Sequence, residues 1–271
     1  MHPFFNLPDA AIFGHRGAAG DAPENTLFAF QTGLDLGADV LESDIRLSRD
    51  GVPVLIHDPD IDRTTDGHGA VVDLELAELM TLDAGYRFVG TAAGDFPFRG
   101  QELRIPTLET AFADFPRARF NLELKGGGER LASEVVRLVE KFDRPSRTLL
   151  TAGDDLQMAQ LRAALDDAGC TVATGACTSD AAGFARAALE NSPPPPGVMA
   201  LQVPAFFGST PLVTVPFVTF AHTHGVPVHV WTIDDEAEME SLLDLGVDGL
   251  ITDYPGRMKS VLERRRARSK T

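Results

Sequence analysis

Two carboxylates in one strand-like segment could form part of a metal site. Glu42 and Asp44 stand two positions apart in Val40 to Leu47, so their side chains would share one face of a strand. In a mostly apolar parallel strand they would repel each other unless a cation or basic groups lay between them. Mg²⁺ and Ca²⁺ take oxygen ligands of this kind, and Mn²⁺ is a further option. An edge strand, or structural arginine partners, is the alternative.

A second strand-like segment, Phe120 to Lys125, adds a third carboxylate and a cation. Glu123 and Lys125 share one face by the same period of two and lie at the carboxyl end of the expected strand. Glu123 would be a third oxygen ligand, and Lys125 could share the charge of a phosphate with the metal. A purely structural ion pair between the two is the alternative.

Two histidines stand at the ends of further strand-like segments. His15 follows Ala11 to Gly14 in the sequence FGHRG, and His57 ends the sequence VPVLIH. Histidine titrates near neutrality, so this pair could act as general base and general acid. Gly14 and Gly17 would leave room for a ligand to approach the backbone beside Arg16.

One aromatic residue is a candidate for the wall of a ligand pocket. Trp231 and His229 share a face of the strand-like sequence VHVWTID. Trp231 could cover a ligand, whereas packing inside a barrel is the expected role of His229.

Short β-rich runs alternate with amphipathic helical stretches to the end of the chain, which is typical of a parallel sheet. If Val52 to His57 accompanies the second strand, eight βα units remain, and right-handed crossovers would close them into a (β/α)8 TIM barrel. A doubly wound open sheet is the alternative. The segment 58–104 is rich in Asp, Gly and Thr and predicts a small inserted subdomain. The expected strands are Ala11 to Gly14, Val40 to Leu47, Val52 to His57, Phe120 to Lys125, Thr148 to Thr151, Val172 to Gly175, Val198 to Val203, Val226 to Ile233 and Gly249 to Thr252.

Composition and charge limit the functional classes. The chain has 271 residues and a formal charge of −16, which would repel nucleic acid and anionic lipid at long range. We expect one domain, 1–271, with a flexible basic tail over about 264–271. The N-terminus shows no signal peptide and the sequence shows no membrane span, so the expected location is cytoplasmic. The pattern leaves the oligomeric state open.

From about Ile12 to Arg257 the sequence resembles the glycerophosphodiester phosphodiesterase family, in the superfamily of phosphodiesterases similar to phosphatidylinositol phospholipase C. The matching motifs are GHRG at 14–17, PENT at 23–26, ESD at 42–44, HD at 57–58, IPTLE at 105–109, ELK at 123–125, VWTID at 230–234 and GVDGLITDYP at 246–255.

This resemblance implies a TIM barrel with an insertion after the second strand. It also implies one divalent metal on Glu42, Asp44 and Glu123, with acid and base at His15 and His57. Arg16 and Lys125 fall where family members hold the phosphate. The implied reaction is hydrolysis of a glycerophosphodiester to sn-glycerol 3-phosphate and an alcohol. Attack by the substrate's own 2-hydroxyl, giving a cyclic phosphate, and direct attack by water both stay open, as do the preferred alcohol and the order in which the histidines act.

Three alternatives to this activity remain. The apolar segment Val203 to Phe220 could bind an acyl chain, which would make the protein a lysophospholipase D, or it could be a helix packed on the barrel. An enolase-type barrel also places metal carboxylates at strand ends, but usually carries a capping domain. A non-catalytic phosphate- or lipid-binding barrel would not need two histidines beside three carboxylates.

Overall fold

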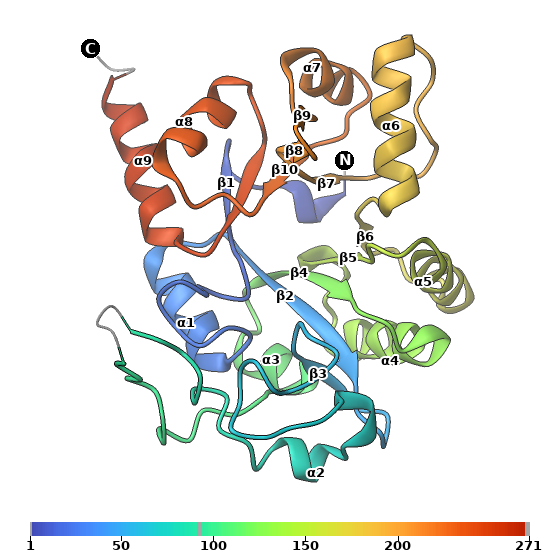
Figure 1. Ribbon diagram of the computed structural model, residues 1–271. Helices are drawn as coiled ribbons and strands as arrows, with labels where there is room; N and C mark the ends of the chain where they lie inside the picture. Colours follow the sequence, from blue (N-terminus) through green and yellow to red (C-terminus); the bar gives the residue numbers. More distant parts are fainter. Residues whose placement is uncertain (1, 91–93, 269–271) are drawn as a thin grey trace.

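Parallel strands and helices alternate along the computed structural model, which describes residues 2–90 and 94–268 (Figure 1). Within these residues eight parallel strands form one curled sheet in the order β6-β5-β4-β2-β1-β11-β10-β7. This arrangement confirms the predicted α/β class and is consistent with a TIM barrel, although no described residues pair β6 with β7. The strands are β1 (Ala11–Gly14), β2 (Val40–Leu47), β4 (Arg119–Leu124), β5 (Thr148–Thr151), β6 (Ala173–Thr174), β7 (Leu201–Pro204), β10 (Val228–Trp231) and β11 (Gly249–Thr252).

The short strand β3 (Pro53–Leu55) pairs antiparallel with β2, as expected for a companion of the second strand. It leads the chain out of the barrel and into the segment that we predicted to be an insertion. That segment contains η2 (Val71–Asp73) and α2 (Leu76–Leu79). Val54 and Ile56 pack with Ile61, Val71 and other apolar residues in a small core of its own.

Helices cover the outer surface of the sheet because each has one apolar face. In α4, Leu131, Val135 and Val139 are fully buried against β2, β4 and α5, whereas the polar residues of the helix face water. The helices are α1 (Leu27–Leu36), α3 (Leu108–Asp114), α4 (Gly128–Lys141), α5 (Asp155–Ala168), α6 (Thr178–Glu190), α7 (Val215–Thr223), α8 (Glu236–Asp244) and α9 (Pro255–Arg268), together with the short η1 (Pro3–Phe5) and η3 (Pro145–Arg147).

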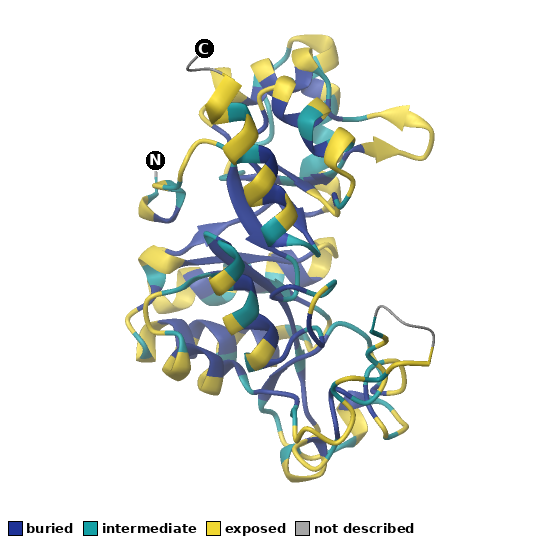
Figure 2. Ribbon diagram, turned by 90° about the vertical axis from the view of Figure 1, so that its left-hand side faces the viewer, coloured by how far each residue is buried: buried dark blue, intermediate teal, exposed yellow. Residues whose placement is uncertain are grey.

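Apolar side chains fill the amino end of the sheet's concave side. Phe13, Val40, Leu149 and Ile251 come from four different strands and pack with Phe4 of η1. Glu42, Asp44 and Glu123 follow later in β2 and β4, toward the carboxyl ends. Figure 2 places the N-terminal turn on one side of the sheet and the insertion on the other. The carboxyl ends are where active sites of this fold class lie.

The C-terminal residues 264–268 differ from the expected flexible tail. They belong to helix α9, and Arg264 and Arg265 form ion pairs with Glu236 and Glu240 of α8. Residues 269–271 lie outside the described part of the chain.

The apolar segment Val203 to Phe220 divides into two parts with different surroundings. Phe217 and Val218 of α7 are buried against the sheet, so the interpretation as a packed helix holds there. The preceding residues form a hairpin of β8 (Phe206–Phe207) and β9 (Thr210–Pro211), which is exposed and projects from the body of the protein (Figure 2).

Among the described residues, no helix combines the length and apolarity needed to cross a membrane. The predicted cytoplasmic location stays a prediction.

Candidate active site

Glu42 and Asp44 lie on the same face of β2, which is the concave side of the sheet. Their residues are only 6% and 1% exposed. Burial, together with the neighbouring charge of Asp44, raises the pKa of Glu42 to about 7. The Glu42 carboxylate accepts a hydrogen bond of 2.9 Å from the backbone N–H of Arg16, and Arg16 Nε lies 3.3 Å from Asp44 Oδ2. The predicted carboxylate pair is therefore present, and arginine provides part of its compensation.

The third carboxylate and the lysine join this pair across the sheet. Asp44 and Glu123 are register partners in the β2–β4 ladder. Lys125 Nζ lies 2.9 Å from Glu123 Oε2 and 3.4 Å from Asp44 Oδ1. Burial alone would lower the pKa of Lys125, but the two carboxylates outweigh it and raise the pKa. The shared face predicted for Glu123 and Lys125 is thus observed.

The loop after β1 holds Arg16 in a compact turn. Arg16 has a left-handed backbone, with φ of 48°, and this directs its N–H to Glu42. A Cβ atom at Gly14 would lie 2.1 Å from the carbonyl oxygen of Gly17, and one at Gly17 would lie 2.5 Å from the backbone of Ala29. Our expectation that these glycines make room for a ligand was therefore wrong: they allow the loop to pack on itself and on α1.

His15 forms a histidine–aspartate pair with a residue that we did not predict. Its Nδ1 lies 2.6 Å from Asp253 Oδ1, and its Nε2 lies 3.9 Å from Glu42 Oε2. Burial alone would lower the pKa of His15, but the hydrogen bond with Asp253 and the charge of Glu42 raise it above 6.5. Asp253 directly follows β11 within the ITDYP motif, so its place at a strand end was a signal that we did not use.

His57 forms a second pair of the same kind. Its Nδ1 lies 2.6 Å from Asp58 Oδ1. Burial alone would raise the pKa of Asp58, but hydrogen bonds with Arg63 and His57 hold it at about 2. The aspartate is therefore ionised over the whole neutral range and can accept the Nδ1 proton of His57.

Arg63 ties this second pair to the carboxylate cluster. Its Nε donates to Asp58 (2.5 Å), and its two terminal nitrogens donate to Glu24 (2.6 and 2.8 Å). Glu24 in turn accepts a hydrogen bond of 2.8 Å from Arg16. A continuous chain of contacts thus runs from His57 in one loop to Arg16 in another, through a residue of the insertion.

Trp231 lies at the same end of the sheet and takes no part in these contacts among the described residues. It ends β10, pairs in register with Pro204 of β7 and is 44% exposed. Its role as a pocket wall stays a prediction. His229 is buried in the interior and stacks on Phe13 at 4.5 Å, which agrees with a packing role.

The three carboxylates offer oxygen ligands for a hard cation, but they do not form a complete metal site. In the described residues, no three side chains of His, Cys, Asp or Glu are grouped closely enough to hold a metal ion. The Lys125 ammonium instead lies between Asp44 and Glu123.

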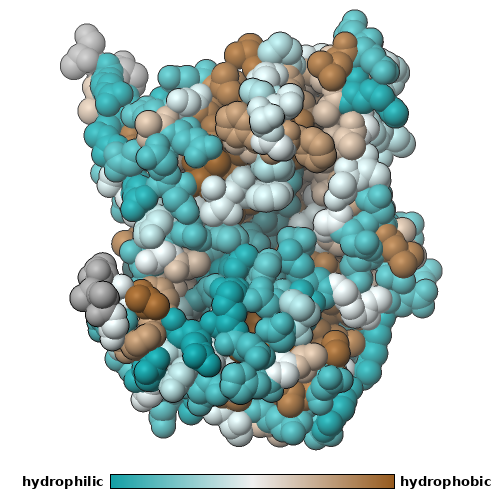
Figure 3. Space-filling view, in the orientation of Figure 1, coloured by the Kyte–Doolittle hydropathy of each residue, from teal (hydrophilic) through white to brown (hydrophobic). Residues whose placement is uncertain are grey.

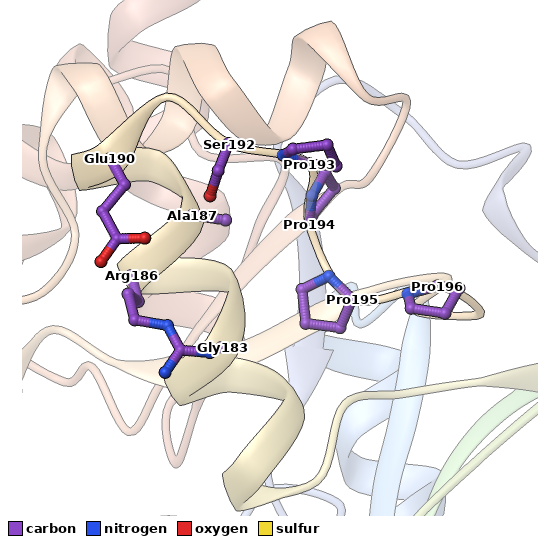
Figure 4. Close-up of a pocket in the computed structure, with 9 residues that line it drawn as sticks. All are labelled: Gly183, Arg186, Ala187, Glu190, Ser192, Pro193, Pro194, Pro195 and Pro196. Carbon is purple, nitrogen blue, oxygen red and sulfur yellow. The ribbon is translucent and has the colours of Figure 1, made fainter.

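A separate cavity of about 470 Å³ lies between α6 and the connection Pro193 to Pro196 (Figure 4). None of its lining residues is a predicted site residue, and its prolines fold back along the helix.

The model of the Glycerophosphoryl diester phosphodiesterase family matches residues 15–257. The chain is 29% identical to a glycerophosphodiester phosphodiesterase of Caldanaerobacter subterraneus subsp. tengcongensis, over 90% of this chain and 94% of that one. It is 26% identical to a lysophospholipase D of Mus musculus, over 92% of this chain and 84% of that one. Among solved structures it is similar to an Oleispira antarctica phosphodiesterase in complex with the product sn-glycerol-3-phosphate, with a TM-score of 0.75, 27% identity and coverage of 97% and 100%.

Proposed function

Because the chain belongs to the glycerophosphoryl diester phosphodiesterase family, we propose that it hydrolyses glycerophosphodiesters to sn-glycerol 3-phosphate and an alcohol. The observation that carries this proposal is the pair of histidine–aspartate contacts beside one buried carboxylate cluster. His15 and His57 each use Nδ1 toward an aspartate, at 2.6 Å in both cases. Each ring therefore keeps Nε2 for a proton of the substrate or of the attacking group.

The carboxylates around Glu42 have the ligand chemistry for a single divalent metal ion, but they would have to move closer together to hold it. Glu42, Asp44 and Glu123 offer carboxylate oxygens, which suit Mg²⁺ or Ca²⁺, with Mn²⁺ as a further option. Burial and the neighbouring charge of Asp44 raise the pKa of Glu42, and a bound cation would favour its ionised form. When bound, such an ion supplies charge neutralisation at a phosphate oxygen and makes an attacking hydroxyl or water more acidic. Lys125 would then give up part of its contact with the carboxylates.

Lys125 and Arg16 would hold the substrate phosphate. Lys125 contacts Asp44 and Glu123, and Arg16 contacts Asp44. The two cations therefore reach the carboxylates from different loops. A phosphate beside these carboxylates would meet positive charge from two sides. Trp231, at the open end of the sheet, would cover the organic part of the substrate.

The test compares two site histidines with a matched control. We expect His15→Ala and His57→Ala each to lower kcat on glycerophosphocholine by about 10²- to 10⁴-fold, because each removes a proton-transfer group. His222→Ala is the control, since His222 also pairs with an aspartate, Asp248 at 2.8 Å, but lies at the end of α7 that precedes the amino end of β10. Unchanged turnover in both site variants would overturn the assignment. Loss of ligand binding without loss of turnover at saturation would favour a binding role.

A second candidate function is the same reaction on a lysophospholipid. The observation that favours it is the exposed pair Phe206 and Phe207, which directly follows β7. Parallel assays on glycerophosphocholine and lysophosphatidylcholine separate the two substrates, and activity on the lysolipid alone would make the protein a lysophospholipase D.

A further inference from the structure

One sector of this acidic protein lacks acidic residues, lysine and arginine altogether. From Asn191 to Ile233 the sequence contains no Asp, Glu, Lys or Arg, although these residues make up 24% of the chain and its net charge is −16. The sector forms β7, the hairpin β8–β9, α7 and β10. Buried strands explain only part of this composition, because several of its side chains are exposed.

The hairpin β8–β9 exposes one aromatic ring on each of its faces. Phe206 is 51% exposed and Phe207 is 81% exposed, and consecutive strand residues point to opposite sides. The base of the hairpin is fixed, because the carbonyl of Ala205 accepts hydrogen bonds from Leu212 (2.9 Å) and Val213 (3.2 Å). A hairpin that packed on one partner surface would need one apolar face only. Exposed apolar patches mark interaction sites for proteins or membranes, and rings on both faces favour insertion into lipid over contact with one protein surface.

The hairpin stands at the end of the sheet that carries the candidate site. It follows the carboxyl end of β7, and Pro204 is the register partner of Trp231. Val215, which is 56% exposed, begins α7 shortly after the hairpin. Figure 3 shows hydrophobic atoms gathered over this half of the face, whereas the half formed by the insertion is mainly hydrophilic.

We propose that Phe206, Phe207 and Val215 form a lipid-contacting rim, by which the protein lies on the surface of a zwitterionic lipid aggregate such as phosphatidylcholine. The rim lies beside the candidate site. If the proposed function holds, the site would bind glycerophosphodiester lipids from that surface. Aromatic rings and Val lose exposed apolar area when they enter the interfacial region, which favours binding.

The charge distribution decides which lipid surface fits. A net charge of −16 repels an anionic leaflet, and the sector offers no Lys or Arg that could bind lipid phosphates in compensation. A zwitterionic surface has no such long-range repulsion. The absence of Asp, Glu, Lys and Arg from the sector also avoids the cost of removing such side chains from water at the interface.

The first experiment measures binding of the full chain to phosphatidylcholine vesicles by co-sedimentation. We expect Phe206→Ser together with Phe207→Ser to weaken the apparent affinity about tenfold or more. Leu189→Ser is the matched control, because Leu189 is 89% exposed on α6, away from the rim. Circular dichroism of the double variant checks that it folds. Absence of vesicle binding in the unchanged protein, equal binding by the double variant, or tighter binding to anionic than to zwitterionic vesicles would each overturn the proposal.

The second experiment separates the role of the rim in lipid binding from the catalytic activity of the site. The double variant should hydrolyse water-soluble glycerophosphocholine at the unchanged rate but aggregated lysophosphatidylcholine several times more slowly. Equal loss on both substrates would overturn the lipid role of the rim. Vesicle binding that depends on Phe206 and Phe207, without hydrolysis of either substrate, would support the rim and refute the proposed function.

Discussion

At the level of single residues, the site depends on carboxylates that orient histidines. Asp253 and Asp58 each lie 2.6 Å from the Nδ1 atom of a histidine. Neither aspartate belongs to β2 or β4, the strands that carry the proposed metal ligands. A carboxylate that accepts the Nδ1 proton fixes the tautomer of the ring and leaves Nε2 for the reaction. The proposed chemistry therefore needs the aspartates as well as the histidines.

The contacts of Arg63 lead to a prediction about how the ring of His57 is positioned. Arg63→Ala removes the donor that Asp58 and Glu24 share, so the ring of His57 would lose its fixed orientation. We expect kcat to fall by about ten- to a hundredfold with a smaller change in KM, because misplacement of a reacting group by about 1 Å has effects of this size. Steady-state kinetics on glycerophosphocholine measure both constants.

Arg63→Lys and Arg49→Ala serve as comparisons. A single ammonium cannot span both carboxylates, so Arg63→Lys should restore little activity. Arg49 forms exposed ion pairs with Glu75 and Glu78, and Arg49→Ala should leave kcat unchanged. Normal kcat in Arg63→Ala would show that Asp58 holds His57 without help.

At the level of elements, several strand boundaries could be read from the sequence. β1, β2, β5 and β11 have the predicted bounds. Helix α1 begins at Leu27 and leaves Glu24 outside the helix. Asn25 has a left-handed backbone and Thr26 caps the helix, which keeps Glu24 in the loop beside Arg63.

Contacts between distant segments could not be read in the same way. Glu24 and Arg63 are 39 positions apart, and His15 and Asp253 are 238 apart. Strand periodicity predicts which face a side chain occupies, as it did for Glu42, Asp44, Glu123 and Lys125. It gives no information about which loop residues meet above that face.

Arg144 provides a prediction about how helix α3 is anchored. It is 2% exposed, and its guanidinium donates to the carbonyls of Phe112 and Phe115 and, by a short hydrogen bond, to that of Ala118. Arg144→Met would leave these carbonyls without their donor. We expect the free energy of unfolding to fall by about 2–4 kcal/mol.

Urea denaturation measures this loss, and KM should stay unchanged because Arg144 lies outside the site. Arg147→Met is the control: Arg147 donates to the carbonyl of Pro116 from an exposed position. Equal stability of the two variants would contradict the anchoring role.

At the level of the whole molecule, the interior of the barrel should make stability depend on pH. Burial lowers the pKa of His229 to about 4, and its Nδ1 has no hydrogen-bond partner in the described part of the chain. Between pH 6.5 and 4 the unfolded chain therefore binds a proton that the folded protein does not. Stability should rise with pH across this window and be lost as pH falls, by on the order of 3 kcal/mol in total.

His229→Leu should remove this contribution, because Leu fills a similar interior space and does not titrate. The measurement is the difference in free energy of unfolding between the variant and the unchanged protein at several pH values from 7 to 4. A constant difference across that window would show that His229 does not control the acid sensitivity.

The fold places the charged residues of the candidate site at one end of the sheet and packed apolar side chains at the other. Phe4 and Phe13 fill the amino end, whereas Glu42 and Asp44 lie toward the carboxyl end. The site therefore has a rigid base beneath it and loops above it, which is the usual division of roles in barrels of this kind.

The most direct test of the central claim is the release of sn-glycerol 3-phosphate from glycerophosphocholine by the purified protein, with and without a chelator. We predict release that stops when the chelator is added, resumes when Mg²⁺, Ca²⁺ or Mn²⁺ is restored in excess, and is abolished in Glu42→Ala. Release that is insensitive to the chelator and to Glu42→Ala would contradict the proposed metal site, and the absence of release under every condition would contradict the proposed hydrolysis of glycerophosphodiesters.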